Sequence, residues 1–286
     1  MGAVSEADRE TGEGLLFVGG AMRSGTTLAA RLLTSSGETN PLLAESQYLG
    51  ALLDLAPQWQ SQFDLFLADY FADPASFDAF SRDVAARFLG VVRARYPQAK
   101  KIVLKHPETT RRFRLLAGWF PQARFVVTVR DPRDTIASMA AVAERLAAKG
   151  ERGSLAAFGR DMGKFCDVFR GYYADTFRDM GLFEGRMLIL RYEDLVANRN
   201  DVIGELARFA DLRIDAARLA DASFWQEGSN WSRQRGSDYA GAFWSPDWVG
   251  AVTEAPVGRY RERLDAAEIG EIERRCADFA KLFRYW

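Results

Sequence analysis

The segment from Gly19 to Leu33, GGAMRSGTTLAARLL, combines residue types that could bind an anion. It follows the apolar run LLFV, and Gly20 and Gly25 have the GxxxxG spacing of a phosphate-binding turn. Where a strand passes through such a turn into a helix, backbone amides converge on an anion, and the hydroxyls of Thr26 and Thr27 would add donors. The alternative is an ordinary glycine-rich turn between a strand and a helix.

The cation of this loop is in an unusual place. A loop that binds a nucleoside triphosphate has lysine at position 26, followed by a serine or threonine that helps to hold Mg²⁺. Here position 26 is threonine, and the cation lies inside the loop, at Arg23. The loop therefore indicates either a different anion or a turn with a surface arginine.

A second candidate anion site follows the apolar run RFVVTV. Arg130 lies at the carboxyl end of this predicted strand, and the next residues, Asp131 and Pro132, suit the N-cap and first turn of a helix. Ligands of open parallel sheets bind at the carboxyl ends of the strands, so Arg130 and Ser138 are expected to face one anion. The alternative is a surface cluster in which Arg130 pairs with Asp131 or Asp134.

Three other polar segments follow predicted strands or lie near the end of the chain. Lys105 ends the run KIVLK and precedes His106, and because adjacent strand residues point to opposite sides, these two need not share a pocket. Tyr192 lies in RYEDL and Arg259 in PVGRYRERL. A packed aromatic residue and a surface arginine are the ordinary interpretations of these last two residues.

The pattern of apolar runs predicts a three-layer α/β sandwich, similar to P-loop proteins, with a central parallel sheet flanked by helices. Nearly continuous apolar runs are typical of strands covered on both faces, and here they alternate with helical segments. The expected strands are Leu15–Gly19, Lys101–Lys105, Arg124–Val129 and Met187–Leu190. The expected helices are Thr27–Thr34, Gln47–Leu55, Phe77–Arg95, Thr110–Trp119, Thr135–Ala148, Leu155–Asp179 and Ala266–Phe283.

We expect residues 1–14 to form a flexible tail and residues 15–286 to form a single domain. Residues 221–256 form a long segment with four tryptophans and many glycines and serines, which favours an acceptor-binding or lid loop. An irregular packed surface segment is the alternative.

Charge and composition exclude several kinds of partner. The 286-residue chain has a net charge of −1, so no overall basic field would attract nucleic acid. Two distant cysteines and one histidine make a metal site or a disulfide framework improbable. The polar, acidic N-terminus is unlike a signal peptide, and no apolar run approaches the roughly 18 residues that span a bilayer. We therefore expect a cytoplasmic protein without a metal or a membrane span.

The run MRSGTTL resembles the phosphosulfate-binding loop of sulfotransferases that depend on 3′-phosphoadenosine 5′-phosphosulfate (PAPS). The similarity is greatest to the branch that contains tyrosylprotein sulfotransferases and many bacterial sulfotransferases. The resemblance implies that Arg23, Ser24, Gly25, Thr26 and Thr27 hold the 5′-phosphosulfate. Such enzymes need no metal, because their donor is already a mixed anhydride.

The resemblance extends from about residue 17 to 264, through LKHP, RDPRDTIAS, RYEDL and PVGRY. It implies that Arg130 and Ser138 bind the 3′-phosphate and that Tyr192 lies near the adenine. Arg259 matches the basic residue of the family's late (S/G)-(K/R)-W segment, although Tyr260 replaces the usual tryptophan.

The family resemblance leaves two candidates for the catalytic base. The tyrosylprotein branch uses a glutamate about twenty residues after the loop arginine, and Glu45 lies 22 residues after Arg23. Cytosolic sulfotransferases often use a histidine two residues after the strand lysine, but His106 is only one residue after Lys105. We favour Glu45 as base, with Arg23 and Lys105 as the cations at the leaving oxygen. A helix N-terminal acid is the structural alternative for Glu45, and a structural histidine for His106.

The sequence thus predicts a sulfotransferase that transfers a sulfuryl group from PAPS to a hydroxyl or amine and releases adenosine 3′,5′-bisphosphate. Small molecules, carbohydrates or other hydroxylated compounds are the expected acceptors. A P-loop nucleotide-dependent kinase is the alternative enzyme, and a non-catalytic module of the same fold is the third interpretation. The sequence leaves the oligomeric state open, a homodimer included.

Overall fold

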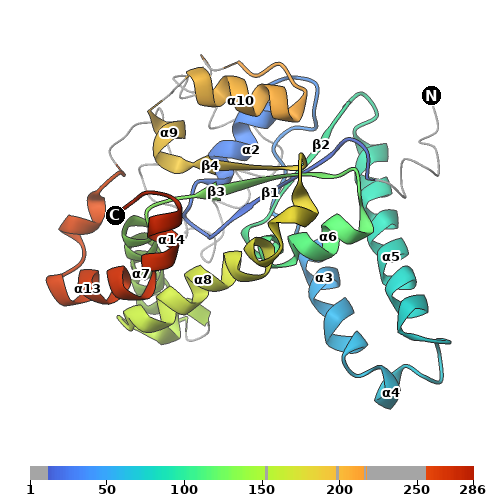
Figure 1. Cartoon of the computed structure of the whole chain (residues 1–286), viewed down its shortest axis with the longest axis horizontal. Helices are drawn as coiled ribbons and strands as arrows, with labels where there is room; N and C mark the ends of the chain where they lie inside the picture. The colour runs from blue at the N-terminus through green and yellow to red at the C-terminus, as the bar shows by residue number, and fades with distance from the viewer. Residues whose placement is uncertain (1–11, 152–153, 198–199, 216, 218–255) are drawn as a thin grey trace.

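The computed structural model describes residues 12–151, 154–197, 200–215, 217 and 256–286. Within them, four parallel strands form one sheet in the order β2-β1-β3-β4 (Figure 1). The strands are β1 (Leu15–Gly20), β2 (Ile102–Lys105), β3 (Arg124–Val129) and β4 (Met187–Arg191). Because β1 lies between β2 and β3, the turn after β1 has the carboxyl ends of both neighbours beside it. None of the helices in these ranges is both long and apolar enough to cross a bilayer.

Helices cover both faces of the sheet. Figure 1 shows α2, α9 and α10 on one face and α6, α7 and α8 on the other. The α-helices are α2 (Thr26–Thr34), α3 (Gln47–Gln60), α4 (Phe63–Phe66), α5 (Pro74–Arg95), α6 (Phe113–Trp119), α7 (Pro132–Ala148), α8 (Met162–Arg178), α9 (Tyr192–Val196), α10 (Asn200–Ala210), α13 (Ala266–Arg275) and α14 (Ala277–Leu282). Short 3₁₀ helices are η1 (Pro107–Arg112), η2 (Ser154–Phe158), η3 (Met180–Phe183) and η7 (Arg259–Glu262). The predicted three-layer sandwich is confirmed.

The core consists of two apolar clusters, one on each face of the sheet. Along β1, Leu15 and Phe17 belong to one cluster, whereas Leu16 and Val18 belong to the other. Successive strand residues point to opposite faces, so a run that is apolar at every position buries both faces at once. This is why the strands lack the polar alternation of a half-exposed sheet.

N-cap residues fix where several helices begin. Asp73 accepts a hydrogen bond from the Ser76 amide at 2.7 Å, with Pro74 in the first turn of α5. At α7 the Asp131 carboxylate accepts from the Arg133 amide at 2.8 Å. Each cap satisfies one of the amides that have no partner within the helix itself.

Two segments expected to be single helices are divided, and the helix expected over Gln47–Leu55 continues to Gln60. The segment predicted as one helix over Leu155–Asp179 contains η2 and then α8, because Asp161 accepts from the Lys164 amide at 3.1 Å and starts a new helix there. The segment predicted as one helix over Ala266–Phe283 breaks at Cys276 into α13 and α14. The break lets α14 pack its aromatic residues on α8, with Phe279 and Phe169 ring centroids 4.8 Å apart.

Helices α3, α4 and α5 extend away from the sheet as an arm, with α4 at its tip (Figure 1). The base of the arm is held together by Tyr48 and Phe88, whose ring centroids lie 5.4 Å apart. The segment predicted as a lid or acceptor loop, residues 221–256, lies outside the described residues except for Pro256. The single-domain assignment stays a prediction.

Candidate functional site

The turn between β1 and α2 has an unusual backbone. Gly20, Arg23 and Gly25 have φ angles of 134°, 71° and 99°, and a positive φ at the non-glycine Arg23 marks a constrained residue of the kind found at functional sites. Gly25 is the N-cap of α2, and a Cβ there would lie 2.5 Å from the Tyr192 ring. No side chain of the described residues caps α2, so its first amides are available to an anion.

Buried hydroxyl groups hold this turn in shape. The Ser24 hydroxyl donates to the Ala21 carbonyl at 2.6 Å and lies 2.7 Å from the Thr128 hydroxyl. The Tyr173 hydroxyl accepts from the Ala21 amide at 2.9 Å and donates to the Thr128 carbonyl at 3.0 Å. Ser24, predicted from the sequence as a ligand contact, therefore has its side chain occupied within the protein. Sequence reasoning missed Thr128 and Tyr173, because no local pattern marks residues that act more than a hundred positions away.

Arg23 and Arg130 lie close together at the carboxyl end of the sheet. Arg23 Nε donates to Ser138 Oγ at 3.0 Å, and Arg130 Nη1 donates to the Arg23 carbonyl oxygen at 3.1 Å. Burial and the nearby charge of Arg130 lower the pKa of Arg23 to about 10, so it is still a cation at neutral pH. The fold thus brings Arg23, Arg130 and Ser138 together, and this concentrated positive charge suits a phosphorylated ligand.

Tyr192 lies against the same arginine. The Arg130 guanidinium stacks on the Tyr192 ring, with 4.3 Å from its carbon to the ring centroid. Arg130 is only 7% exposed, and its Nε has no hydrogen-bond partner among the described residues. Because buried polar groups are normally hydrogen-bonded, this nitrogen is a candidate ligand contact. Tyr192 reaches this place because β4 pairs with β3 and ends beside it.

Asp134 anchors the late segment of the chain beside Arg130. Its buried carboxylate accepts hydrogen bonds from the amides of Gly258 at 2.7 Å and Tyr260 at 2.9 Å. Burial raises the pKa of Asp134. Arg130 Nη2 in turn donates to the Pro256 carbonyl at 2.6 Å. Arg259 lies between the two anchored amides. In the sequence, Asp134 is an acidic residue four positions after Arg130, and that spacing suggested only an ion pair between the two.

On the other side of the turn, β2 ends in an ion pair. Lys105 Nζ lies 2.6 Å from Glu45 Oε1, with the lysine side chain 7% and the glutamate side chain 34% exposed. The Ser46 amide donates to the Lys105 carbonyl at 3.3 Å, which ties the segment before α3 to the strand end. Burial disfavours the Glu45 carboxylate, but the charge and hydrogen bond of Lys105 outweigh it and hold the pKa of Glu45 below its usual value.

His106 is buried beside this pair and faces α3. A Cβ on Gly50 would lie 2.9 Å from its ring, and its Nδ1 has no hydrogen-bond partner in the described part of the chain. Burial lowers the pKa of His106, so the imidazole is neutral at neutral pH. The structure thus places both candidate bases near Lys105, and Glu45 forms an ion pair with its ammonium group.

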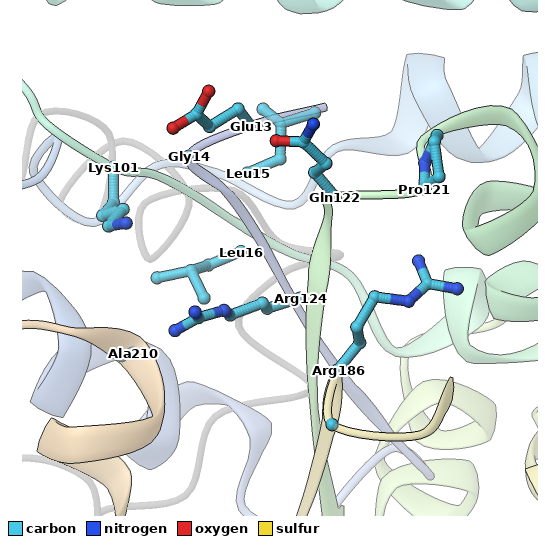
Figure 2. A pocket seen from close by; sticks show the side chains of 11 residues that line it. Glu13, Gly14, Leu15, Leu16, Lys101, Pro121, Gln122, Arg124, Arg186 and Ala210 are labelled. Carbon is cyan, nitrogen blue, oxygen red and sulfur yellow. The ribbon is translucent and has the colours of Figure 1, made fainter. Parts of the chain in front are cut away.

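A cavity of about 340 Å³ lies at the opposite end of the strands (Figure 2). Lys101 and Arg124 line it, and both have partners within the protein. Lys101 lies 3.5 Å from the Asp211 carboxylate, and Arg124 donates to the Phe209 carbonyl. Its basic side chains are therefore engaged within the protein, and the cavity gives no sign of an anion site.

A parallel sheet that ends in a glycine-rich, arginine-containing turn, with an uncapped helix N-terminus, is typical of P-loop-like folds, in which such a turn can bind an anion. The sulfotransferase family model matches residues 16–216. The chain belongs to the sulfotransferase family. No group of three or more potential metal-binding side chains occurs among the described residues.

Known proteins agree with this assignment. The chain is 24% identical over 210 residues to the protein-tyrosine sulfotransferase of Drosophila melanogaster, an alignment that covers 73% of this chain but 40% of that protein. The sulfotransferase domain from the curacin biosynthetic pathway has a similar fold, with a TM-score of 0.57, 18% identity and coverage of 92% of this chain and 97% of that one. Retinol dehydratase in a complex with retinol and PAP gives a TM-score of 0.50 at 15% identity, covering 96% of this chain and 85% of that one.

Proposed function

We propose that this protein is a sulfotransferase that moves the sulfuryl group of PAPS to a hydroxyl or amine of a small-molecule or carbohydrate acceptor. One observation carries the proposal: Arg23, Arg130, Ser138 and Tyr192, from separate segments, converge beside the uncapped N-terminus of α2. Family membership and the complex of a structural neighbour with PAP support the same donor.

In this proposal the two phosphate groups of the nucleotide bind on the two sides of Arg23. The amides at the start of α2, the hydroxyls of Thr26 and Thr27, and Arg23 bind the 5′-phosphosulfate. Gly25 provides the backbone conformation, and Ser24 shapes the turn from behind.

The 3′-phosphate then binds Arg130, whose Nε lacks a partner in the described structure, together with Ser138. Arg259 lies on the segment that Asp134 anchors and joins this side of the site. Tyr192 stacks on Arg130 and lies at the edge of the adenine position.

Sulfuryl transfer forms a bond between the acceptor oxygen and sulfur as the bond from sulfur to the bridging oxygen of the nucleotide breaks. Glu45 accepts the acceptor's proton, since Lys105 holds it ionised and its carboxylate is still about a third exposed. Arg23 and Lys105 stabilise the charge on the leaving oxygen. His106 is the alternative base; its buried neutral ring would have to be reached from the α3 side.

Titration calorimetry tests the donor directly. Adenosine 3′,5′-bisphosphate should bind in the micromolar range or tighter without added metal, whereas ATP with Mg²⁺ should compete poorly. No binding of the bisphosphate, or tighter binding of ATP with Mg²⁺, would reject the proposal. The kinase alternative is not favoured, because the family match and the threonine at position 26 both oppose it.

A panel of phenols, sugars and amines would then define the acceptor, with release of the bisphosphate from PAPS as readout. The Drosophila relative is named for tyrosine, so a tyrosine-containing peptide belongs in the panel. Bisphosphate release that depends on one acceptor class would identify it, and release that no acceptor stimulates would count against transfer.

A further inference from the structure

The arm formed by α3, α4 and α5 carries an unpartnered helix face. Most of the exposed large hydrophobic side chains in the described ranges lie between Tyr48 and Val91, including Phe80 at 53% and Val91 at 70% exposure. Isolated surface hydrophobics are ordinary, but an apolar gathering on one projection is typical of an interaction site.

On α5 the exposed residues form a regular stripe. Phe77, Ala85 and Leu89 pack inward, whereas Phe80, Arg87, Val91 and Ala94 are exposed, with the half-buried Val84 between them. The positions 80, 84, 87, 91 and 94 alternate in steps of four and three, which is the seam of a two-helix coiled coil. The stripe runs for about 20 Å along the helix, at 1.5 Å per residue.

We propose that this stripe pairs with the same stripe of a second copy of the chain, in antiparallel orientation about a two-fold axis between residues 85 and 86. Phe80 then lies opposite Val91 of the second copy, and Val84 opposite Arg87. Ala94 lies beyond the paired positions, because its counterpart, Phe77, packs inward. The pairing is self-complementary, as an interface with two-fold symmetry requires.

Charge complementarity favours a second copy of the chain as the partner, in the antiparallel orientation. Asp83 and Arg87 are exposed near the centre of the stripe, so the axis brings Asp83 of each copy beside Arg87 of the other. A parallel pair would place like charges together, which is unfavourable. Within one copy Asp83 contacts Arg82 at 3.1 Å, and its side chain is still 64% exposed and able to accept a second cation.

The ends of the arm agree with this orientation. The stretch from Asp54 to Ser81 contains five aspartates and no lysine or arginine, whereas Arg93 and Arg95 lie near the end of α5. Antiparallel pairing places the acidic tip of one arm along the basic end of the other. The same acidic charge disfavours an anionic membrane as the occupant, since membrane-binding faces are usually basic.

The contact is modest in size. A single helix pair of this length falls at the low end of specific interfaces, below roughly 1,200 Å² in total, so the dissociation constant should be on the order of 10 µM. Sedimentation equilibrium of the full chain from about 1 to 200 µM should therefore show a reversible monomer–dimer equilibrium.

Charge reversal tests the proposed register. D83R and R87D should each weaken dimerisation at least tenfold, because two-fold symmetry turns both attractions into repulsions. The double variant D83R/R87D should return to within about threefold of the wild type, a rescue that a folding defect would not give. E144R, at the exposed side chain of Glu144 on α7, is the matched control and should leave the dissociation constant unchanged.

Cross-linking tests the orientation. The double variant F80C/V91C should form a covalent dimer on oxidation, whereas F80C alone should not, and Cys166 and Cys276 are buried. A monomer at every concentration, a dimer unaffected by both reversals, or cross-linking of F80C alone would overturn the proposal. Binding of the monomer to phosphatidylcholine vesicles through the same residues would also overturn it.

Discussion

Replacement of Glu45 by glutamine is the sharpest test of the proposed chemistry. The amide has nearly the same shape but cannot accept the acceptor's proton, and it loses the charge that lies 2.6 Å from Lys105. Positioned general bases contribute about 10²- to 10⁴-fold, so we expect kcat to fall by that factor, equivalent to about 2.7–5.5 kcal/mol in the barrier.

Folding and nucleotide binding should change much less. The Glu45 side chain is 34% exposed and the glutamine oxygen can still accept the hydrogen bond from Lys105, but the lysine is only 7% exposed and loses its counter-charge, so the loss of stability should be about 1–2 kcal/mol. Bisphosphate affinity should stay within about threefold by calorimetry, because Glu45 lies on the β2 side and the proposed 3′-phosphate contacts on the β3 side. The assay is release of adenosine 3′,5′-bisphosphate from PAPS with a saturating acceptor, followed by chromatography.

A matched control exists in the same chain. Glu38 also forms an ion pair with a lysine, Lys100, at 2.5 Å, but lies among no proposed site residues. E38Q should turn over like the wild type. If E45Q retains turnover within threefold of wild type, Glu45 is not the base, and H106N should then carry the large loss.

Three further predictions concern the nucleotide side and the pH profile. Arg130→Ala should weaken binding of adenosine 3′,5′-bisphosphate by about 10- to 100-fold in calorimetry, since it removes charge-assisted hydrogen bonds, but should leave adenosine 5′-phosphosulfate nearly unchanged; equal losses would contradict the 3′-phosphate assignment. Gly25→Ala should destabilise the fold by about 2 kcal/mol or more in denaturant unfolding, because its φ is 99° and its Cβ would clash, whereas Gly118→Ala in open space should be neutral or stabilising. A similar effect of both would remove the steric argument. Lys105 lowers the pKa of Glu45, so the ionised base is lost only as pH falls below its usual range. Lys105→Met removes the largest influence that opposes burial, and the acid limb of kcat/KM should move to higher pH. An unmoved limb would show that the pair does not set the protonation of the base.

Much of the architecture could be predicted from local sequence. Strands buried on both faces are apolar at every position, and this pattern located all four strands to within about one residue. Helix ends were harder where capping competes with an unbroken helical pattern, as at Asp161. The break at Cys276 has no local signal, since it follows from how α14 packs on α8.

The candidate site also combines features set by local sequence with features set by distant contacts. Gly25 and Arg23 stand in one contiguous loop, and glycine at position 25 permits the positive φ found there. A positive φ at Arg23 is uncommon for a non-glycine residue and is held by the surrounding structure. Asp134 illustrates the opposite case. Its role as an anchor depends on amides at positions 258 and 260, and nothing in the sequence near residue 134 reports what arrives from that distance.

By itself, the sequence determined the class of fold and the glycine-rich turn after the first strand and, through its resemblance to a family, the expected donor. These properties reside in short segments, because hydrophobic period, turn conformation and helix capping are set by neighbouring residues. Only the tertiary structure decided that Glu45 forms an ion pair with Lys105, that Arg130 lies against Tyr192, and that the α5 stripe is exposed. The strand order β2-β1-β3-β4 makes these contacts, and such an order follows from packing the whole chain around two faces of one sheet.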